Sequence, residues 1–251
     1  MKRRDYQPIY ENTYHRHHRR RWWLLLGLML VLVAGGLGWS RWQAHQKQQL
    51  ANYPVRGVTI NQDSGYLDFQ QLANHTDFAY LQATSGATYT DDDFSDNYSR
   101  SQGASLKVGV VHTFSFTSSA ARQYRHFHET VGQNTGTLPI MVAVSYYGKY
   151  NGNSADMATQ GQKLKQLVSQ LEWYHQGVII FGTKQVINQF VRPVLPNQDY
   201  WVAGGKLAGH SSQVKLIEYD ASGSVTQNGQ SLPVARSVFN GTTRAWKKFS
   251  D

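Results

Sequence analysis

The stretch LKVGVVHTFSFTSSAARQYRHFHETVGQNTGTLPIMVAVS, residues 106–145, decides the fold class of this chain. It opens with an apolar run typical of a buried strand and closes with a second one from Ile140 to Ser145. Between them, residues 118–132 read as a helix, because serine is a good N-cap and Gly132 a good terminator. Strand, helix and strand in this order predict a parallel β/α unit.

The same alternation extends to both sides of this unit. Repeated units of this kind favour a parallel barrel or a doubly wound sheet. The tail, at 214–225 and 232–241, looks β-rich around a turn at Gly223. Further strands are expected at 56–61, 78–84, 178–183 and 200–205, and further helices at 67–74, 91–104, 155–175 and 184–191.

The positive charge of the chain is concentrated near its N-terminus. Residues 1–49 hold 9 Lys/Arg and 2 Asp/Glu, whereas residues 50–251 hold 16 and 14, so the two parts carry +7 and +2. The main body therefore gives no support to a nucleic-acid-binding function. The chain has no cysteine, so it has neither a disulfide nor a thiolate nucleophile.

An uncharged apolar segment, residues 22–39, predicts a transmembrane helix. Eighteen helical residues span about 27 Å, close to the thickness of the hydrocarbon core, and tryptophans flank both ends. A cleaved signal peptide is the alternative, since Ala34, Gly36 and Gly38 are small, but the long leader favours an uncleaved signal anchor.

The basic run at residues 16–21 sets the expected orientation. The positive-inside rule places residues 1–21 in the cytoplasm as a basic tail and the C-terminal part outside the cell. Residues 40–54 are polar, glutamine-rich and too irregular to predict a helix, so we interpret them as a stalk. A folded domain is then expected over residues 55–251.

Several motifs of this domain resemble glycoside hydrolase family 25, the muramidase-type lysozymes. The most specific is DFAYLQATSGATYTDDDFSDNY, residues 77–98, which keeps the family's Ala-Thr, Gly, Tyr, Asp, Phe and Asn at matching spacing. His112, Gln123 and Phe127 also match, as do YWVA at 200–203 and EYDASGSV at 218–225. The resemblance implies an irregular TIM-like β/α barrel of five β/α units closed by three further strands.

The resemblance also implies where catalytic acids should lie, and this sequence lacks them. The family carries an acid in its first strand, an Asp-x-Glu pair at the end of the fourth, and an Asp near the C-terminus. The matching positions here are Thr59, Val142, Val144 and Ala235. Glycosidic cleavage needs a proton donor and a group that supports the oxocarbenium-like centre, and these side chains supply neither.

Acids at other positions remain candidates for a relocated catalytic pair. The part of the chain after residue 50 has three glutamates, of which Glu129 and Glu172 fall on expected outer helices. Glu218 lies in the last strands and Asp63 follows the first one, so both could approach the groove. The competing interpretation for each is a solvated surface charge.

Sugar binding could persist without catalysis, because sugars stack on aromatic rings. The expected ligand-binding residues are Tyr146, Tyr147, Tyr150, Trp201 and Tyr219, which come from strand ends or the loops after them. For Trp201, packing in the core is an equally good interpretation. The resemblance implies no cofactor, and we expect no metal site.

Three functions follow from these expectations. The first is a membrane-anchored, extracytoplasmic pseudoenzyme that binds peptidoglycan glycan strands or a protein of the wall machinery. The second is an active muramidase that uses relocated acids. The third is an interaction scaffold of the envelope whose groove is filled by Val142, Val144 and their neighbours.

Overall fold

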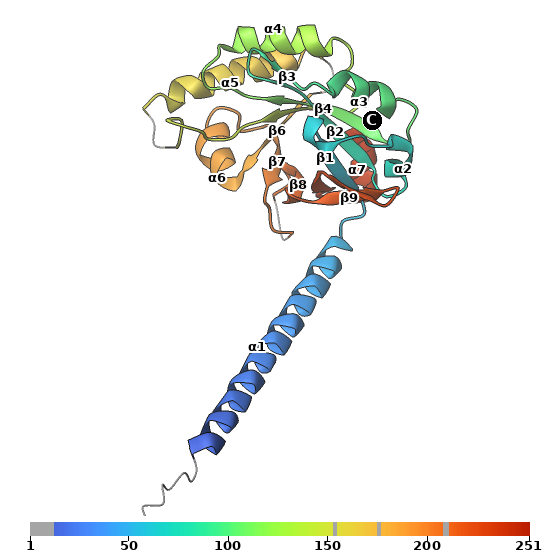
Figure 1. Cartoon of the computed structure of the whole chain (residues 1–251). Coiled ribbons are helices and arrows are strands. Elements are labelled where there is room, and N and C mark those ends of the chain that lie inside the picture. Colours follow the sequence, from blue (N-terminus) through green and yellow to red (C-terminus); the bar gives the residue numbers. More distant parts are fainter. Residues whose placement is uncertain (1–12, 153–154, 175–176, 208–210) are drawn as a thin grey trace, which may run out of the picture. The chain divides into compact units, whose positions relative to one another are not determined.

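A computed structural model describes residues 13–152, 155–174, 177–207 and 211–251 of the chain. It divides into two compact units, Met1–Ala51 and Asn52–Asp251, and each is described by itself. Figure 1 shows the helix of the first unit and the barrel of the second.

The first unit is built on one long helix, α1 (Thr13–Leu50). Its residues Arg21–Arg41 are long and apolar enough to cross a membrane, with a mean hydropathy of 1.9. Residues 40–50 belong to the same helix, although their irregular pattern predicted no helix there. Glutamine, alanine, lysine and leucine are good helix formers. The helix of the apolar segment can therefore continue through residues 40–50 without an amphipathic pattern.

The second unit is a closed barrel of eight strands, which confirms the predicted fold class. Neighbouring strands are parallel except for β11, which runs antiparallel between β8 and β1. The barrel order is β1 (Arg56–Ile60), β2 (Phe78–Ser85), β4 (Lys107–Thr113), β5 (Ile140–Ala143), β6 (Val178–Thr183), β7 (Asp199–Ala203), β8 (Val214–Asp220) and β11 (Ala235–Phe239).

Helices surround the barrel, and α4 and α5 lie side by side over one part of it (Figure 1). Ser119 caps α4 by accepting a hydrogen bond from the Arg122 backbone N–H, as the sequence predicted for this region. The helices are α2 (Phe69–Ala73), α3 (Phe94–Ser101), α4 (Ala120–Val131), α5 (Met157–Leu171), α6 (Lys184–Val186) with η2 (Ile187–Val191), and α7 (Thr243–Ser250). A short turn η1 (Gln62–Ser64) follows β1.

The barrel interior is filled by large side chains from strands on opposite sides. Trp201 lies with its ring centroid 4.9 Å from Tyr80 and 6.3 Å from Phe78. All three are fully buried. Met141 belongs to the same cluster, and Ala143 packs against it. This packing leaves the barrel without an open channel and confines any ligand to its two ends.

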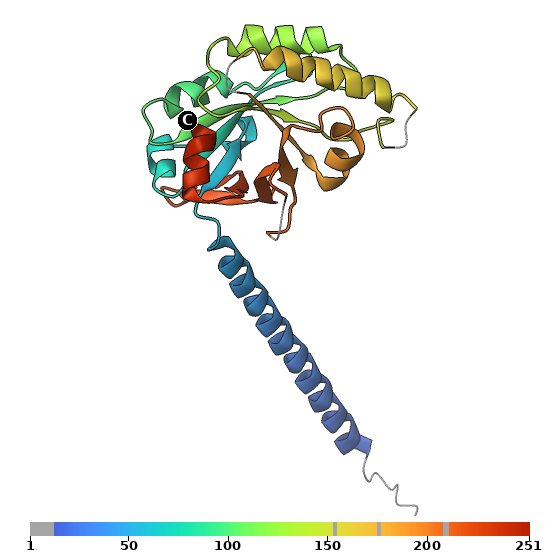
Figure 2. The ribbon, with the colours of Figure 1, turned by 180° about the vertical axis from the view of Figure 1, so that it is seen from behind.

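Helix α7, which the sequence did not predict, closes the amino end of the barrel (Figure 2). Trp246 packs against Phe78 and Phe239, with ring centroids 5.2 Å apart in both pairs. Phe78 begins β2 and Phe239 ends the antiparallel β11, so both rings lie at the end where the parallel strands start. The opposite end, where the parallel strands stop, is the mouth.

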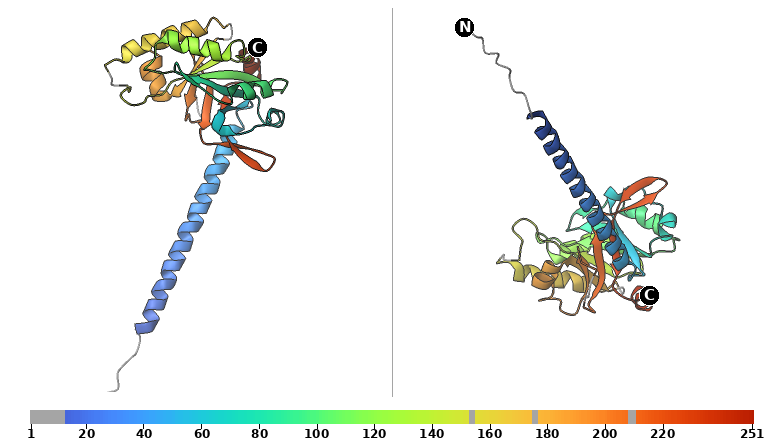
Figure 3. Two further views of the ribbon diagram at one scale, coloured as in Figure 1. Left: turned by 45° about the horizontal axis from the view of Figure 1, so that its top comes forward. Right: turned by 90° about the horizontal axis from the view of Figure 1, so that it is seen from below.

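A β-hairpin outside the barrel wall borders the mouth (Figure 3). It consists of β9 (Ser224–Gln227) and β10 (Gln230–Pro233), joined by Asn228 and Gly229, both with positive φ. Asn-Gly is the preferred sequence for such a tight turn. Gln227 fixes the hairpin to the rest of the fold, because its side-chain amide bonds the backbone N–H and carbonyl of Asp68, each at 2.8 Å.

Two further short elements complete the fold. The strand β3 (Tyr89–Thr90) pairs antiparallel with the end of β2 and leads into α3. Asp91 follows it and is buried, where its carboxylate accepts hydrogen bonds from the backbone N–H groups of Gln62 and Asp93. Asp91 therefore ties η1 to the start of α3, which is a structural role.

Candidate functional site

A pocket of about 420 Å³ opens at the mouth, between the end of β1 and the start of β11. Strand ends supply its floor, while η1 and the segments flanking the β9–β10 hairpin supply its sides. The lining is almost entirely neutral. Its residues are Thr59, Ile60, Asn61, Asp63, Ser64, Gln82, Ala221, Ser222, Gly223, Pro233, Val234 and Ala235.

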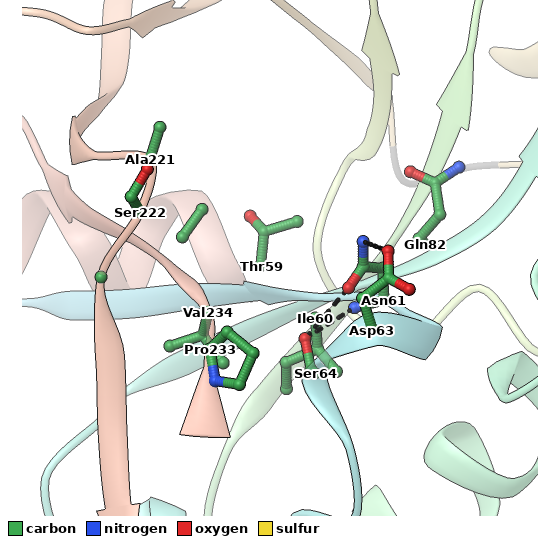
Figure 4. Close-up of a pocket in the computed structure, with 12 residues that line it drawn as sticks. Thr59, Ile60, Asn61, Asp63, Ser64, Gln82, Ala221, Ser222, Pro233 and Val234 are labelled. Atoms are coloured by element: carbon green, nitrogen blue, oxygen red, sulfur yellow. Dashed lines mark hydrogen bonds between the residues drawn. The ribbon is translucent and has the colours of Figure 1, made fainter. Parts of the chain in front are cut away.

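The η1 turn forms a rigid polar wall of the pocket (Figure 4). The Ser64 hydroxyl donates to Asn61 Oδ1 at 3.1 Å, and the Asn61 backbone N–H donates to Ser64 Oγ at 3.2 Å. Asn61 Nδ2 also lies 3.5 Å from Asp63 Oδ2. These contacts hold one exposed carboxylate, that of Asp63, at the edge of the pocket.

Two of the four neutral positions, Thr59 and Ala235, face each other in this pocket. They are paired across the antiparallel β1–β11 ladder, so their side chains share one face of the sheet. Both line the pocket. The pair therefore presents a hydroxyl and a methyl group to the pocket, and neither acts as a general acid or base at neutral pH.

The expectation that Val142 and Val144 face the mouth is wrong. Val142 pairs with His112, whose ring packs against Phe127 of α4, so Val142 points outward to the helices. Its neighbour Ala143 instead packs against the barrel core. Val142 and Val144 are 0% and 2% exposed and lie outside the pocket lining. A strand alternates its faces with a period of two, so a shift of one residue moves a side chain to the other face.

Glu218 is the acid that the fold directs inward. It pairs with Ser237 on β11, two residues from the paired Leu216 and Phe239 of the core. Because alternate residues share a face, Glu218 points to the same interior. It is 8% exposed, and burial raises the pKa of its carboxyl, an effect that the Gly204 backbone N–H opposes. Glu218 is thus a buried carboxyl near the end of β8, outside the pocket lining.

Three tyrosines expected to bind sugars form an aromatic cluster with Phe116 and are not part of the pocket lining. Tyr150 stacks on Phe116 with an interplanar angle of 17° and a centroid distance of 5.0 Å. The Phe116 backbone N–H donates to the Tyr147 hydroxyl at 2.9 Å, and Tyr146 packs on Phe116 and Phe190. None of the three lines the pocket, so their contacts hold loops together after β4 and β5.

The other two expected binders are also outside the pocket lining. Trp201 is fully buried in the barrel core, which agrees with the packing interpretation. Tyr219 lies under the guanidinium of Arg236, with Cζ 5.5 Å from the ring centroid. The pocket lining is therefore aliphatic and polar, and none of the five aromatic residues contributes to it.

The pocket contains polar residues that sequence reasoning missed. Gln82 lies in the second half of β2, where its amide donates to the Thr84 carbonyl at 2.9 Å, and it also lines the pocket. Ser64 and Ser222 add hydroxyls, and Asn61 adds an amide. Gln82 immediately precedes the Ala-Thr motif at a strand end, and this position could have identified it.

The residues that matched the family motifs most clearly form a buried network instead. Thr84 Oγ1 lies 2.8 Å from His112 Nδ1, and Gln123 Oε1 lies 3.3 Å from His112 Nε2. Gln123 also accepts from the Ser115 backbone N–H at 2.7 Å. Burial lowers the pKa of His112 to about 4, so the ring is neutral at pH 7. This network joins β2, β4 and α4.

Within the described residues, no three His, Asp or Glu side chains gather closely enough to hold a metal ion.

Comparisons with known proteins show which family this chain matches. The family model described as glycosyl hydrolases family 25 matches residues 58–222. An uncharacterised protein, YegX of Escherichia coli K12, is 26% identical over 217 residues, which cover 80% of this chain and 75% of that protein. An autolytic lysozyme of Clostridium acetobutylicum is 30% identical over 78 residues, 31% of this chain and 24% of that protein.

Solved structures agree in fold. A family 25 glycosyl hydrolase from Bacillus anthracis superposes with a TM-score of 0.71 at 24% identity, over 80% of this chain and 95% of that one. A lysozyme from Streptomyces coelicolor gives 0.62 at 20% identity, over 78% and 96%. The autolysin LytC from Streptococcus pneumoniae, solved with a synthetic peptidoglycan ligand, gives 0.59 at 15% identity, over 74% and 46%.

Proposed function

Because this chain belongs to glycosyl hydrolase family 25, we propose that it is a membrane-anchored, extracytoplasmic protein that binds peptidoglycan glycan strands without cleaving them. The observation that carries the proposal is the neutral pocket at the mouth. Thr59 and Ala235 line it together, and Asp63 is the one acid in its lining.

Hydrolysis of a glycosidic bond requires two acidic functions at one bond. One carboxylic acid protonates the leaving oxygen, and a second carboxylate, or the substrate's own acetamido group, supports the charge on the sugar. Thr59 and Ala235 can do neither, and Ala143, which faces the interior on β5, is neutral as well. Two residues after Ala143 comes Ser145, so the family's Asp-x-Glu spacing also fits the pair Ala143 and Ser145.

Binding a sugar needs no catalytic acid. It needs polar groups and apolar surface, and the pocket lining has both. Asn61, Gln82 and Ser222 offer amide and hydroxyl groups, while Ile60, Pro233 and Val234 offer apolar surface. Pockets that bind small polar ligands combine an apolar lining with a few fixed polar groups. The LytC structure supports the choice of ligand, since that protein shares the fold and was solved in complex with a synthetic peptidoglycan ligand.

The anchor is the second part of the proposal. Residues Arg21–Arg41 of α1 meet the length and composition of a membrane span, and the basic run before them orients the barrel outward. A barrel held in this way on the outer face of the membrane lies next to the wall polymer that its family relatives act on.

The test measures cleavage and binding on the same preparation. Full-length protein in detergent should release no reducing ends from purified peptidoglycan above the buffer level, yet should sediment with insoluble walls. Gln82→Ala and Asn61→Ala should weaken the sedimentation, whereas Tyr146→Phe, a change outside the pocket, should leave it unchanged. Failure of the wild type to sediment would favour a scaffold that binds an envelope protein.

One observation favours the active-muramidase alternative. Glu218 is a buried carboxyl with a raised pKa, a state suited to a general acid, and Asp63 offers a second carboxylate at the pocket. If the protein releases reducing ends and either Glu218→Gln or Asp63→Asn abolishes the release, the acids have relocated and the non-catalytic proposal is overturned.

A further inference from the structure

The outer face of α7 carries a positive stripe at the amino end of the barrel. Trp246 and Phe249 turn inward and pack on Phe239, at centroid distances of 5.2 and 5.4 Å. Arg244, Lys247 and Lys248 are exposed on the same helix. Their spacing of three and four residues places them on one side of the helix. None of them forms an ion pair with a carboxylate in the described parts of the chain.

The acids at this end are already engaged. Asp251 pairs with Lys107 at 3.0 Å, and Asp199 pairs with Lys215 at 3.6 Å. Asp77 accepts from the Arg56 backbone N–H at 2.8 Å. The positive stripe of α7 therefore keeps a net positive charge, because the nearby carboxylates already have other partners.

The chain enters the barrel next to this stripe. Asn52, Tyr53 and Pro54 line a hollow of about 470 Å³ together with residues 240–243, which lead into α7. Leu50, two residues before Asn52, ends α1. Nine residues of helix separate Arg41, the end of the apolar span, from Leu50, a rise of about 14 Å. The covalent connection thus limits how far α7 can lie from the membrane that α1 would cross.

We propose that α7 docks the amino end of the barrel on the anionic lipid headgroups of the membrane, through Arg244, Lys247 and Lys248. This inference rests on the anchor in the proposed function. Basic side chains next to a membrane segment are attracted to anionic lipids within about a Debye length, roughly 10 Å at moderate salt. The mouth lies at the opposite end of the barrel, so docking directs the pocket away from the membrane and toward the wall.

An exposed tryptophan at the same end fits this orientation. Trp173 is 81% exposed and follows α5, beside Glu172, whose carboxylate accepts from Gln198 just before β7 begins. Tryptophan is enriched at membrane–water interfaces, where its ring meets the headgroups.

The absence of cysteine from the chain allows a direct test by single-site labelling. Ala245→Cys places a fluorophore on exposed α7, and Ser222→Cys places the matched control at the mouth. Each full-length variant is reconstituted into vesicles of phosphatidylglycerol or of phosphatidylcholine that contain a headgroup-attached quencher. Flotation of the vesicles first establishes that the chain is membrane-inserted.

In phosphatidylglycerol vesicles the Ala245 label should be quenched strongly and the Ser222 label weakly. The difference in quenching between the two labels should shrink in phosphatidylcholine vesicles and in high salt. It should also shrink in the triple variant Arg244→Gln, Lys247→Gln, Lys248→Gln. Binding of α7 to the headgroups should weaken on the order of a hundredfold in this variant.

Floating protein with equal quenching at both labels would overturn the docking and leave the anchor intact. Protein that does not float would overturn both. A triple variant that keeps its quenching but no longer sediments with walls would also contradict the inference, because the stripe would then bind a wall polymer.

Discussion

His112 contributes to stability through its neutral state. Its ordinary pKa of 6.5 falls to about 4 in the fold, so the unfolded chain binds the proton more readily at intermediate pH. The contribution of neutral His112 to the free energy of unfolding is complete above pH 6.5 and is lost as the pH falls toward 4. A pKa difference of about 2.5 corresponds to about 3.5 kcal/mol, because a pKa difference of one corresponds to about 1.4 kcal/mol.

The measurement is urea unfolding between pH 7 and pH 4. Wild-type protein should lose stability across this interval. His112→Asn should be less stable at pH 7, because Thr84 and Gln123 lose a buried partner, but its stability should vary less with pH. Equal pH slopes for the two proteins would refute this role of His112.

Glu218 should act in the opposite direction. Burial raises its pKa in the fold, so the folded chain keeps the proton longer, and stability declines as the pH rises from about its ordinary value of 4.5 through the raised one. Glu218→Gln has the same shape without the charge and should raise the melting temperature at pH 7. A lower melting temperature would show that the ionised carboxylate has a stabilising partner stronger than the Gly204 N–H.

The sequence allowed some site residues to be predicted and misplaced others. Thr59 and Ala235 could be predicted because the motif around each fixes the strand face. Val142 and Val144 were misplaced because an unbroken apolar run carries no alternation to show which face is inward. The packing of Tyr150 on Phe116 could not be predicted, because a position after a strand does not reveal which ring a side chain contacts.

At the scale of elements, α7 should be more important for stability than its length suggests. Trp246→Ala removes the indole that packs on Phe78 and Phe239 and should destabilise the barrel by about 3–5 kcal/mol. Exposed Lys247→Ala on the same helix should stay within about 0.5 kcal/mol of the wild type. Urea unfolding of the three proteins measures both values, and a mild effect of Trp246→Ala would mean that the amino end closes without it.

The β9–β10 hairpin depends on one buried side chain. Gln227→Ala leaves the Asp68 backbone N–H and carbonyl without their partner and should lower stability by about 1–3 kcal/mol. Gln230→Ala, on the exposed side of the same hairpin, is the matched control. Thermal unfolding compares the two variants, and similar melting temperatures would contradict this role of Gln227 in fixing the hairpin.

Long elements with a clear apolar period could be predicted from the sequence. Short elements with a weak pattern could not. The helix at 118–132 and the strand at 178–183 followed from caps and apolar period, and α4 and β6 confirm them. Helix α7 was not predicted because it has only eight residues. Two inward-facing aromatic residues among basic ones give only a weak helical pattern. The barrel closure depends on contacts between β1, β2 and β11, which are distant in sequence, so it was inferred from the family resemblance.

For the whole molecule, the basic run at residues 16–21, before the apolar part of α1, predicts the topology. Protease added to intact protoplasts should digest the barrel and spare an epitope at the N-terminus, because the positive-inside rule predicts that residues 1–21 lie in the cytoplasm. Sequencing of the mature N-terminus then separates an anchor from a signal peptide. A start between residues 36 and 44 would mean that the protein is released, and protection of the barrel would reverse the orientation.

The helical extension of α1 beyond Arg41 also bears on how tightly the pocket has to bind. A binding site tethered by a short link meets a neighbouring polymer at an effective concentration in the millimolar range. Many copies in one membrane facing one continuous polymer would act together, so that individual contacts can exchange rapidly while the layer as a whole remains attached. Soluble, monomeric barrel would then bind walls much more weakly than the same barrel displayed on a vesicle, and the gap between the two would measure avidity.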